Sequence, residues 1–218
     1  CYLAIRSKAR PRFSMRRRPL WELMKISAPL VVTGFVYTLF MSVDRLLITR
    51  FLGIEALGHY SIALLVVAYA NVVPKLLATV VFPNMQEDFG GSGSQEGIAR
   101  FVVKPATLLI YGMPFLLGGA YLTAPYLVEY VLPKYVPGLD AMRIFLLGAF
   151  FIALCQPIQT YLTTIYKRWQ NLPIVLLGAA VALTSGLLLI KSGYGLAGVA
   201  AGMTAGFFVY YSVLLFYV

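Results

Sequence analysis

Six apolar segments, each long enough to cross a lipid bilayer, constrain this sequence more than any other feature. A membrane-spanning helix needs about 20 predominantly apolar residues. Charged residues make up only 12% of the chain, about half of the fraction in a soluble domain. The sequence therefore predicts an all-α polytopic membrane protein with a bundle of six transmembrane helices. The expected spans cover about residues 26–51, 59–85, 98–122, 142–166, 172–190 and 196–218.

Basic residues gather before the first span and set the expected orientation. Residues 1–25 hold eight Lys and Arg, which is typical of a cytoplasmic segment beside anionic lipid and does not indicate nucleic-acid binding. With the N-terminus inside, twelve basic residues lie on the inner side and five on the outer side. This excess predicts that the N-terminus is cytoplasmic. We expect the protein to lie in the inner (cytoplasmic) membrane. We expect residues 1–25 to form a basic linker, with LWELMKI as an amphipathic helix on the membrane surface, and residues 26–218 to form the bundle.

Small residues recur at four-residue spacing in the last two spans. Gly198, Gly202 and Gly206 lie on one face of the sixth span, and Gly178, Ala182 and Gly186 lie on one face of the fifth. Such spacing lets two helices approach closely. The pattern predicts a buried helix–helix contact, and a contact that moves during function is the alternative.

Polar residues interrupt the first span. Asp44 and Arg45 stand side by side in an apolar run, and Arg45 continues a face that includes Thr38 and Ser42. A charge within the hydrocarbon region costs at least a few kcal/mol, so it should face a partner, a cavity or the interface. Asp44 and Arg45 therefore either form a structural pair or line a polar path.

Two further spans carry polar residues at helical spacing. Asn71 and Lys75 share a face of the second span, and Gln156 and Gln159 lie in the fourth. Lys75 either reaches the inner surface or faces a cavity, where it could meet a phosphate. The glutamines either join helices or bind sugar hydroxyls. The candidate substrate-binding residues are Arg45, Lys75, Asn71, Asp44, Gln156 and Gln159.

Enzyme signatures are absent from the sequence. His59 is the only histidine, and there is no Gly-rich phosphate loop ending in Lys-Ser/Thr. Cys1 and Cys155 suggest neither a disulfide framework nor a metal site. We expect a protein that is not an enzyme and that needs no cofactor or metal.

The order of several short motifs resembles a known family. A basic segment leads into ISAPLVV, then DRLLITRFLG, EALGHYSIA, VVFPNMQEDFG and GYGLAGVAAG. The chain resembles the polysaccharide transporter family, which comprises O-antigen and exopolysaccharide flippases of the multidrug/oligosaccharidyl-lipid/polysaccharide exporter superfamily. The resemblance implies two six-helix bundles around a central cavity, and the Arg-rich leader resembles the linker that precedes the second, C-terminal bundle. The chain also ends inside an apolar run, so we expect a piece of a longer protein.

Three functions follow as expectations. The resemblance implies a flippase for a lipid-linked oligosaccharide or polysaccharide precursor, whose diphosphate a cavity lined by cations such as Arg45 and Lys75 would suit. The expected partners are this glycan, membrane lipids and the other half-bundle, with no nucleic acid. A cation-coupled multidrug exporter of the same fold is one alternative, and only Asp44 offers it a membrane-embedded acid. A membrane scaffold for glycan synthesis that transports nothing is the other.

Overall fold

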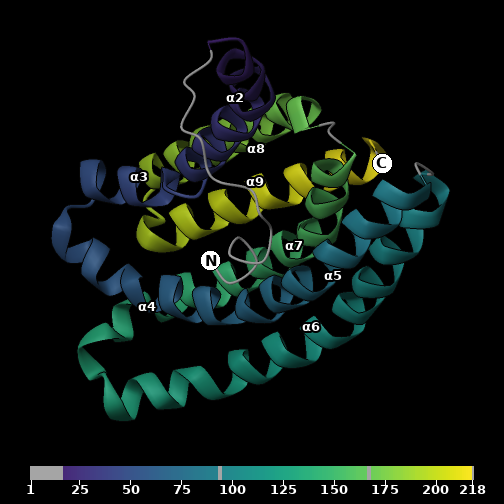
Figure 1. Cartoon of the computed structure of the whole chain (residues 1–218). Helices are drawn as coiled ribbons and strands as arrows, with labels where there is room; N and C mark the ends of the chain where they lie inside the picture. The colour runs from purple at the N-terminus through teal and green to yellow at the C-terminus, as the bar shows by residue number, and fades with distance from the viewer. Residues whose placement is uncertain (1–16, 93–94, 166–167, 218) are drawn as a thin grey trace, which may run out of the picture.

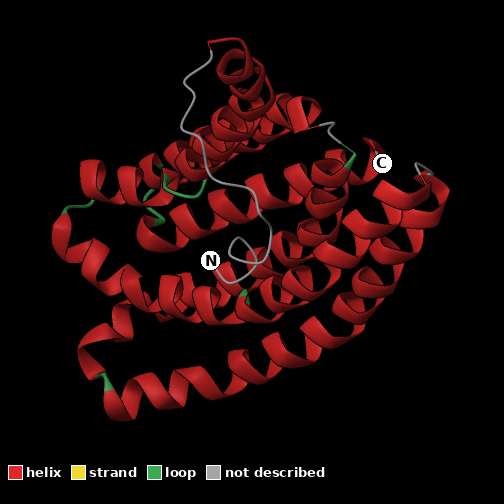
Figure 2. Cartoon of the chain, viewed as in Figure 1, coloured by secondary structure: helices red, strands yellow, loops and turns green. Residues whose placement is uncertain are grey.

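The computed structural model describes residues 17–92, 95–165 and 168–217, which are almost entirely helical, with no strand among them (Figure 2). Short turns join the helices. In chain order the elements are α2 (Arg17–Phe40), α3 (Val43–Phe51), α4 (Ile54–Ala70), α5 (Val72–Ser92), α6 (Gln95–Val131), the 3-10 helix η1 (Pro133–Gly138), α7 (Leu139–Thr164), the 3-10 helix η2 (Arg168–Gln170), α8 (Asn171–Lys191) and α9 (Gly195–Tyr217).

The helices agree with the predicted six-span, all-α fold. The described residues hold five helices that are long and apolar enough to cross a membrane, or six when the bent pair α2–α3 is taken as one span. The sequence left APYLVEYV open as a continuation of the third span beyond Leu122 or as an interfacial turn, and the structure shows a continuation, because α6 runs to Val131. The prediction of a polytopic all-α protein is confirmed.

Residues 17–25, the described part of the expected linker, are joined directly to the first span. Residues 1–16, which carry five of the eight leading basic residues, lie outside the described part. Helix α2 begins at Arg17 and runs through the LWELMKI sequence to Phe40 without interruption. The predicted surface helix is therefore continuous with the span, and its position at a membrane surface stays a prediction.

Helix α9 runs through the middle of the bundle between α7 and α8 (Figure 1). A Cβ atom added to Gly202 would lie 2.5 Å from the backbone nitrogen of Gly186, and one added to Gly206 would lie 2.6 Å from the Cβ of Ala182 and 2.7 Å from the carbonyl oxygen of Gly178. Real Cβ atoms essentially never come this close to other atoms. The backbones of α8 and α9 are therefore in contact, which confirms that the glycine face of the sixth span is buried.

A series of aromatic ring contacts links four helices, α2, α9, α7 and α4. Phe40, at the end of α2, lies 5.3 Å from Phe207 and 6.0 Å from Tyr210 of α9 between ring centroids. Phe207 stacks on Phe145 of α7 at 5.9 Å, and Phe145 contacts Tyr60 of α4 at 5.8 Å. Each such pair contributes about 0.5–1.5 kcal/mol beyond the area it buries. These ring contacts hold the first two spans against the α7–α9 core.

Helix α6 forms one edge of the bundle (Figure 1). It packs on α5, α7 and η1, and large apolar side chains cover the rest of its surface, with Phe115 88% exposed and Tyr130 90% exposed. A water-soluble protein rarely leaves such a surface open. This edge suits contact with lipid chains.

Candidate functional site

The first two spans meet at Gly53 and then pack on different neighbours. Gly53 has a φ of 90°, which glycine adopts without strain. From this turn α3 and α2 follow α8, whereas α4 and α5 follow α7 (Figure 1). The predicted polar residues of the two spans are therefore held by opposite sides of the bundle.

The first span bends by 41° between α2 and α3, where the sequence had predicted an unbroken helix. The hydroxyl of Thr38 donates to the carbonyl of Gly34 at 2.9 Å, and that of Ser42 donates to the carbonyl of Thr38 at 2.9 Å. Hydroxyls that bond to the carbonyl four residues earlier often bend a helix. Thr38 and Ser42 thus bond to their own helix at the bend and are not free hydroxyls on a polar path.

Asp44 and Arg45 differ in burial although they are adjacent in the sequence. Asp44 is fully buried, whereas Arg45 is exposed. Oδ1 of Asp44 accepts the backbone N–H of Arg45 at 2.7 Å in the first turn of α3, where an acid is favoured by the helix dipole. Their side chains do not form an ion pair in the described part of the chain. Of the two sequence interpretations, a structural pair at the helix end agrees with this carboxylate–backbone hydrogen bond, although the two side chains are not ion-paired.

Tyr60 of α4 is the neighbour of Asp44 that the sequence analysis missed. Its phenol lies beside the Asp44 carboxylate. The two groups do not meet the distance and angle of a normal hydrogen bond, and both Asp44 Oδ2 and Tyr60 Oη are buried without a partner. The signal was available, because Asp44 lies nine residues before Gly53 and Tyr60 seven residues after it. Residues about equally far from the turn of a helical hairpin lie at similar depth.

Asn71 marks a break in the second span. It lies between α4 and α5, and its Nδ2 donates to the carbonyl of Val67 at 2.9 Å. Pro74 follows and lacks the N–H that would bond to the carbonyl of Ala70. Oδ1 of Asn71 is buried and has no partner among the described residues. Lys75, one turn later, is exposed.

The glutamines of the fourth span lie on α7 and are both half-buried. The hydroxyls of Thr160 and Thr163 donate to the backbone carbonyls of Gln156 and Gln159 at 2.8 Å and 2.7 Å, so these hydroxyls are used within the helix. The Gln159 amide lies beside the phenol of Tyr37 on α2, a second residue that sequence reasoning missed. Its Nε2 is buried without a hydrogen-bond partner of normal geometry.

Buried polar atoms without partners are concentrated in the predicted site. Of the five such side-chain atoms in the described ranges, three belong to Asp44, Asn71 and Gln159, and the others belong to Tyr60 and Arg143. Leaving a buried donor or acceptor unpaired costs about 1–3 kcal/mol. Native proteins keep few such groups, and those that they keep call for an explanation such as a ligand, an ion or water. The three spans thus present donors and acceptors that the chain itself does not use.

The two predicted cations are not brought together. Arg45 lies eight residues from Gly53 and Lys75 lies 22 residues from it, or about 12 Å and about 33 Å along their helices. Their helices, α3 and α5, pack mainly on different neighbours. Arg45 and Lys75 therefore occupy different levels of the bundle.

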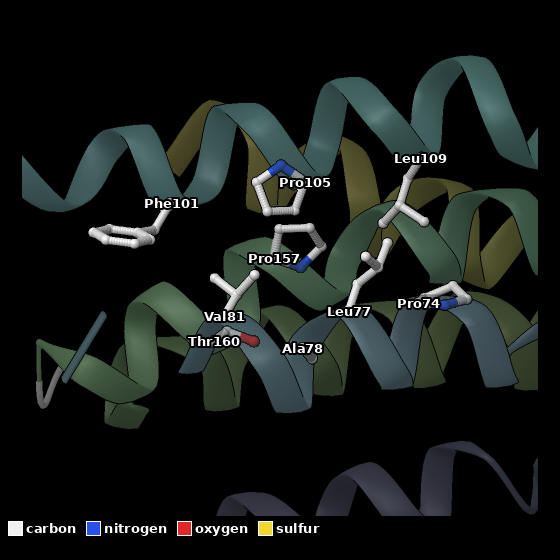
Figure 3. Close-up of a pocket in the computed structure, with 9 residues that line it drawn as sticks. All are labelled: Pro74, Leu77, Ala78, Val81, Phe101, Pro105, Leu109, Pro157 and Thr160. Atoms are coloured by element: carbon white, nitrogen blue, oxygen red, sulfur yellow. The ribbon is translucent and has the colours of Figure 1, made fainter. Parts of the chain in front are cut away.

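Three prolines converge where α5, α6 and α7 meet, which the sequence did not reveal. Pro74, Pro105 and Pro157 line one small pocket of about 10 Å³, and Figure 3 shows the rings of Pro105 and Pro157 next to each other. This volume has room for about one water molecule at most. The pocket is too small for a substrate. Each proline removes one backbone hydrogen bond, which makes this junction a place where the three helices can bend.

Comparison with known proteins identifies the family. The profile of a family described as polysaccharide biosynthesis protein matches residues 1–134, which is more than half of the chain. The chain belongs to this polysaccharide biosynthesis protein family. The match confirms the resemblance drawn from the sequence motifs. No curated protein matches, and no solved structure matches.

The family match and the helices together define the class of protein. The chain is a multi-pass membrane protein with a role in polysaccharide biosynthesis or transport. The matched segment includes Asp44, Arg45, Asn71 and Lys75, and ends before Gln156 and Gln159. Among the residues that the structure describes, no three His, Cys, Asp or Glu side chains lie close enough to hold a metal ion.

Proposed function

We propose that this polysaccharide biosynthesis protein is one bundle of a flippase that moves a lipid-linked oligosaccharide or polysaccharide precursor across the cytoplasmic membrane by alternating access. The observation that carries the proposal is the set of buried polar atoms left without partners on three spans, at Asp44, Asn71 and Gln159. In a family that acts on polysaccharide, sugar hydroxyls are the natural partners for them.

The chemistry of these atoms matches that of a sugar. A hydroxyl both donates and accepts a hydrogen bond, so one sugar hydroxyl can donate to Oδ1 of Asn71 and a different one can accept from Nε2 of Gln159. The phenol of Tyr37, beside Gln159, offers a further polar atom together with an aromatic ring. Gln156, on the same helix, would act with Gln159. A glycan bound there would remove the cost of leaving these atoms unpaired.

The cations suit the other part of the cargo. A lipid-linked precursor carries a diphosphate, and both Arg45 and Lys75 are exposed in this chain. In the proposed transporter they would face the space between this bundle and the other half-bundle, with Arg45 near one opening and Lys75 near the other. Asp44 would lower the hold of Arg45 on the diphosphate, since transport needs release as well as capture.

The proposed orientation places the N-terminus in the cytoplasm. It is supported by the twelve-to-five excess of basic residues on that side. The Gly53 turn, η1 and the turn between α8 and α9 would then face outward. Arg45 would serve the outer opening and Lys75 the inner one.

The test replaces each cation in the full-length protein and measures both its abundance in the membrane and the glycan at the cell surface. Arg45→Gln and Lys75→Gln should keep normal abundance and lose surface glycan. Arg50→Gln and Lys191→Gln are matched controls, because each removes an exposed cation at the end of a helix. They should leave the glycan unchanged.

Two results would reject the proposal. A normal amount of surface glycan in both the Arg45→Gln and the Lys75→Gln variants would mean that the two side chains only extend to the membrane–water interface and do not bind the substrate. Loss of glycan without loss of translocation of the precursor, measured in vesicles, would favour the scaffold that anchors glycan-synthesis enzymes.

One observation favours a second candidate, a cation-coupled exporter of the same fold. Oδ2 of Asp44 is a buried carboxylate oxygen without a partner beside Tyr60, and a coupling ion could occupy that position. Asp44→Asn should then abolish efflux of a cationic dye that is driven by a proton or sodium gradient. Absence of gradient-driven efflux by the unaltered protein would remove this candidate.

A further inference from the structure

A polar pocket lies between α6 and α7 and includes none of the residues of the proposed substrate path among its lining. It has a volume of about 220 Å³ and opens near the end of the bundle that carries η1. Five of its lining residues come from α6 and one, Arg143, comes from α7. They are Tyr121, Leu122, Pro125, Tyr126, Glu129 and Arg143.

Arg143 has bonding capacity that its neighbours do not use. Its guanidinium carbon lies 5.8 Å from the centre of the Tyr121 ring, and NH1 lies 3.9 Å from the carboxylate of Asp140. Asp140 is 81% exposed, and such exposed pairs contribute about 0–1 kcal/mol. Nε of Arg143 is buried and has no hydrogen-bond partner in the described chain. An anion held by Arg143 would supply the missing acceptor.

Glu129 places the opposite charge in the same pocket. Its side chain is exposed and lines the pocket together with the ring of Tyr126. With Asp140 also close to Arg143, the pocket does not favour a simple anion. A ligand that carries a phosphate and an ammonium group together fits this pair of charges, because the ammonium can donate to Glu129 and lie against the Tyr126 ring.

An apolar groove continues from this pocket into the hydrocarbon region. Tyr121 lines both the polar pocket and a groove of about 490 Å³ between α6, α7 and α9. No charged residue lines the groove, which includes Pro114, Gly118 and Leu147. From Glu129 to Tyr121 is about 12 Å along α6, and from Tyr121 to Pro114 is about 10 Å more. Together these distances span about 22 Å, which matches one leaflet with its headgroups, about 20–22 Å thick, of which about 15 Å is hydrocarbon.

We propose that the pocket and groove bind one phospholipid whose headgroup carries both a phosphate and a primary ammonium, such as phosphatidylethanolamine. The phosphate binds Arg143, the ammonium binds Glu129, and one acyl chain lies in the groove. A free sugar or inorganic phosphate would leave the apolar groove empty. The groove on the other side of α6, lined by residues such as Leu65, Tyr69 and Leu127, also lacks charged lining residues and meets the polar pocket at Tyr126, not at the Tyr121 ring that Arg143 contacts.

The test measures which lipids remain bound to the purified full-length protein, by native mass spectrometry and by the rise in melting temperature on lipid addition. The probes are phosphatidylethanolamine, phosphatidylglycerol and phosphatidylcholine with identical acyl chains. The first should bind about tenfold more tightly than the other two. Arg143→Gln and Glu129→Gln should each abolish this preference, while Lys134→Gln, on exposed η1 and outside the pocket, should keep it.

A second pair of variants tests the groove without touching the charges. Gly118 and Gly119 are neighbours on α6, both are exposed, and a Cβ on either would meet nothing within 4 Å. Only Gly118 lines the groove. Gly118→Leu should fill the groove and weaken lipid retention about tenfold, whereas Gly119→Leu should not. Melting temperatures without added lipid confirm that both variants are folded.

Three results with the unaltered protein would overturn the proposal. They are equal retention of the three lipids, a preference for phosphatidylglycerol, and displacement of the bound lipid by inorganic phosphate or a free oligosaccharide. Equal lipid retention by the Gly118→Leu and Gly119→Leu variants would also overturn it. None of these readouts depends on glycan transport, so failure here and failure of the proposed flippase activity are distinguishable.

Discussion

The contact between α8 and α9 makes a quantitative prediction about one methyl group. In Gly202→Ala, the new Cβ would lie 2.5 Å from the nitrogen and 2.6 Å from the Cα of Gly186. Ordinary van der Waals contact begins at 3.4 Å, so the two backbones must separate by about 0.9 Å. Both atoms belong to backbone, and no side chain can rotate to make room.

The expected cost follows from two opposing effects. Overpacking a well-packed interior costs about 1–3 kcal/mol. Replacing glycine with alanine inside a helix stabilises the helix by about 1 kcal/mol. Separation of the helices also loosens the next contact along the pair, at Gly206 and Ala182. We expect Gly202→Ala to be less stable than the unaltered protein by up to about 2 kcal/mol, which lowers the melting temperature by up to about 8 °C.

Gly119→Ala is the matched control. Gly119 is also helical, but a Cβ added there meets nothing within 4 Å. Only the propensity effect remains, and stability should rise by about 0.5–1 kcal/mol. Thermal unfolding of both variants in the same detergent measures the difference in sign. A melting temperature for Gly202→Ala equal to or above that of Gly119→Ala would refute the close contact between α8 and α9.

Three further predictions concern topology and buried polar groups. On intact cells, an impermeant thiol reagent should label a cysteine at Ser192 and not one at Ser94, a position outside the described residues, in a cysteine-free background; the reverse pattern would invert the proposed orientation. Tyr210→Phe removes the donor of a buried 3.1 Å hydrogen bond and should cost about 1–2 kcal/mol in thermal unfolding, whereas Tyr217→Phe, at an exposed pair, should cost less than about 0.5 kcal/mol; equal costs would contradict the structure. Asp44→Asn replaces a buried carboxylate that has an unpaired oxygen with a neutral group of the same shape, so the melting temperature should stay equal or rise; a marked fall would mean that the charge itself holds the fold.

The fold was predictable from the sequence because its main determinants are local. Apolar length identifies a membrane span, and the spacing of Gly198, Gly202 and Gly206 identifies a close helix contact without knowledge of the partner. The bend after Phe40 was not predicted, because no proline or glycine marks it. It follows from the hydroxyls of Thr38 and Ser42 bonding within their own helix, and a helical stripe of polar residues looks the same whether its hydroxyls face inward to the backbone or outward to a ligand.

The candidate site shows that residue type alone predicts some of its members and not others. Asp44, Asn71 and Gln159 were singled out because they are polar within apolar spans, and each has a buried polar atom without a partner. Their neighbours Tyr37 and Tyr60 were missed, since tyrosine is ordinary in a membrane helix and is significant here only through the groups it faces.

The bend in the first span also explains why Asp44 is buried and Arg45 is exposed. Successive residues of a straight helix point about 100° apart, so one of two adjacent charges can face the interior while the other does not. The break places Asp44 in the first turn of a new helix, where its carboxylate accepts a free backbone N–H and tolerates burial. Arg45, one residue on, is left exposed and unpaired by its neighbour. The same local break therefore produces both a buried acid that needs a partner from elsewhere and a cation available to a ligand. An uninterrupted helix would leave Asp44 without a backbone N–H to accept, because every N–H inside a helix is already bonded.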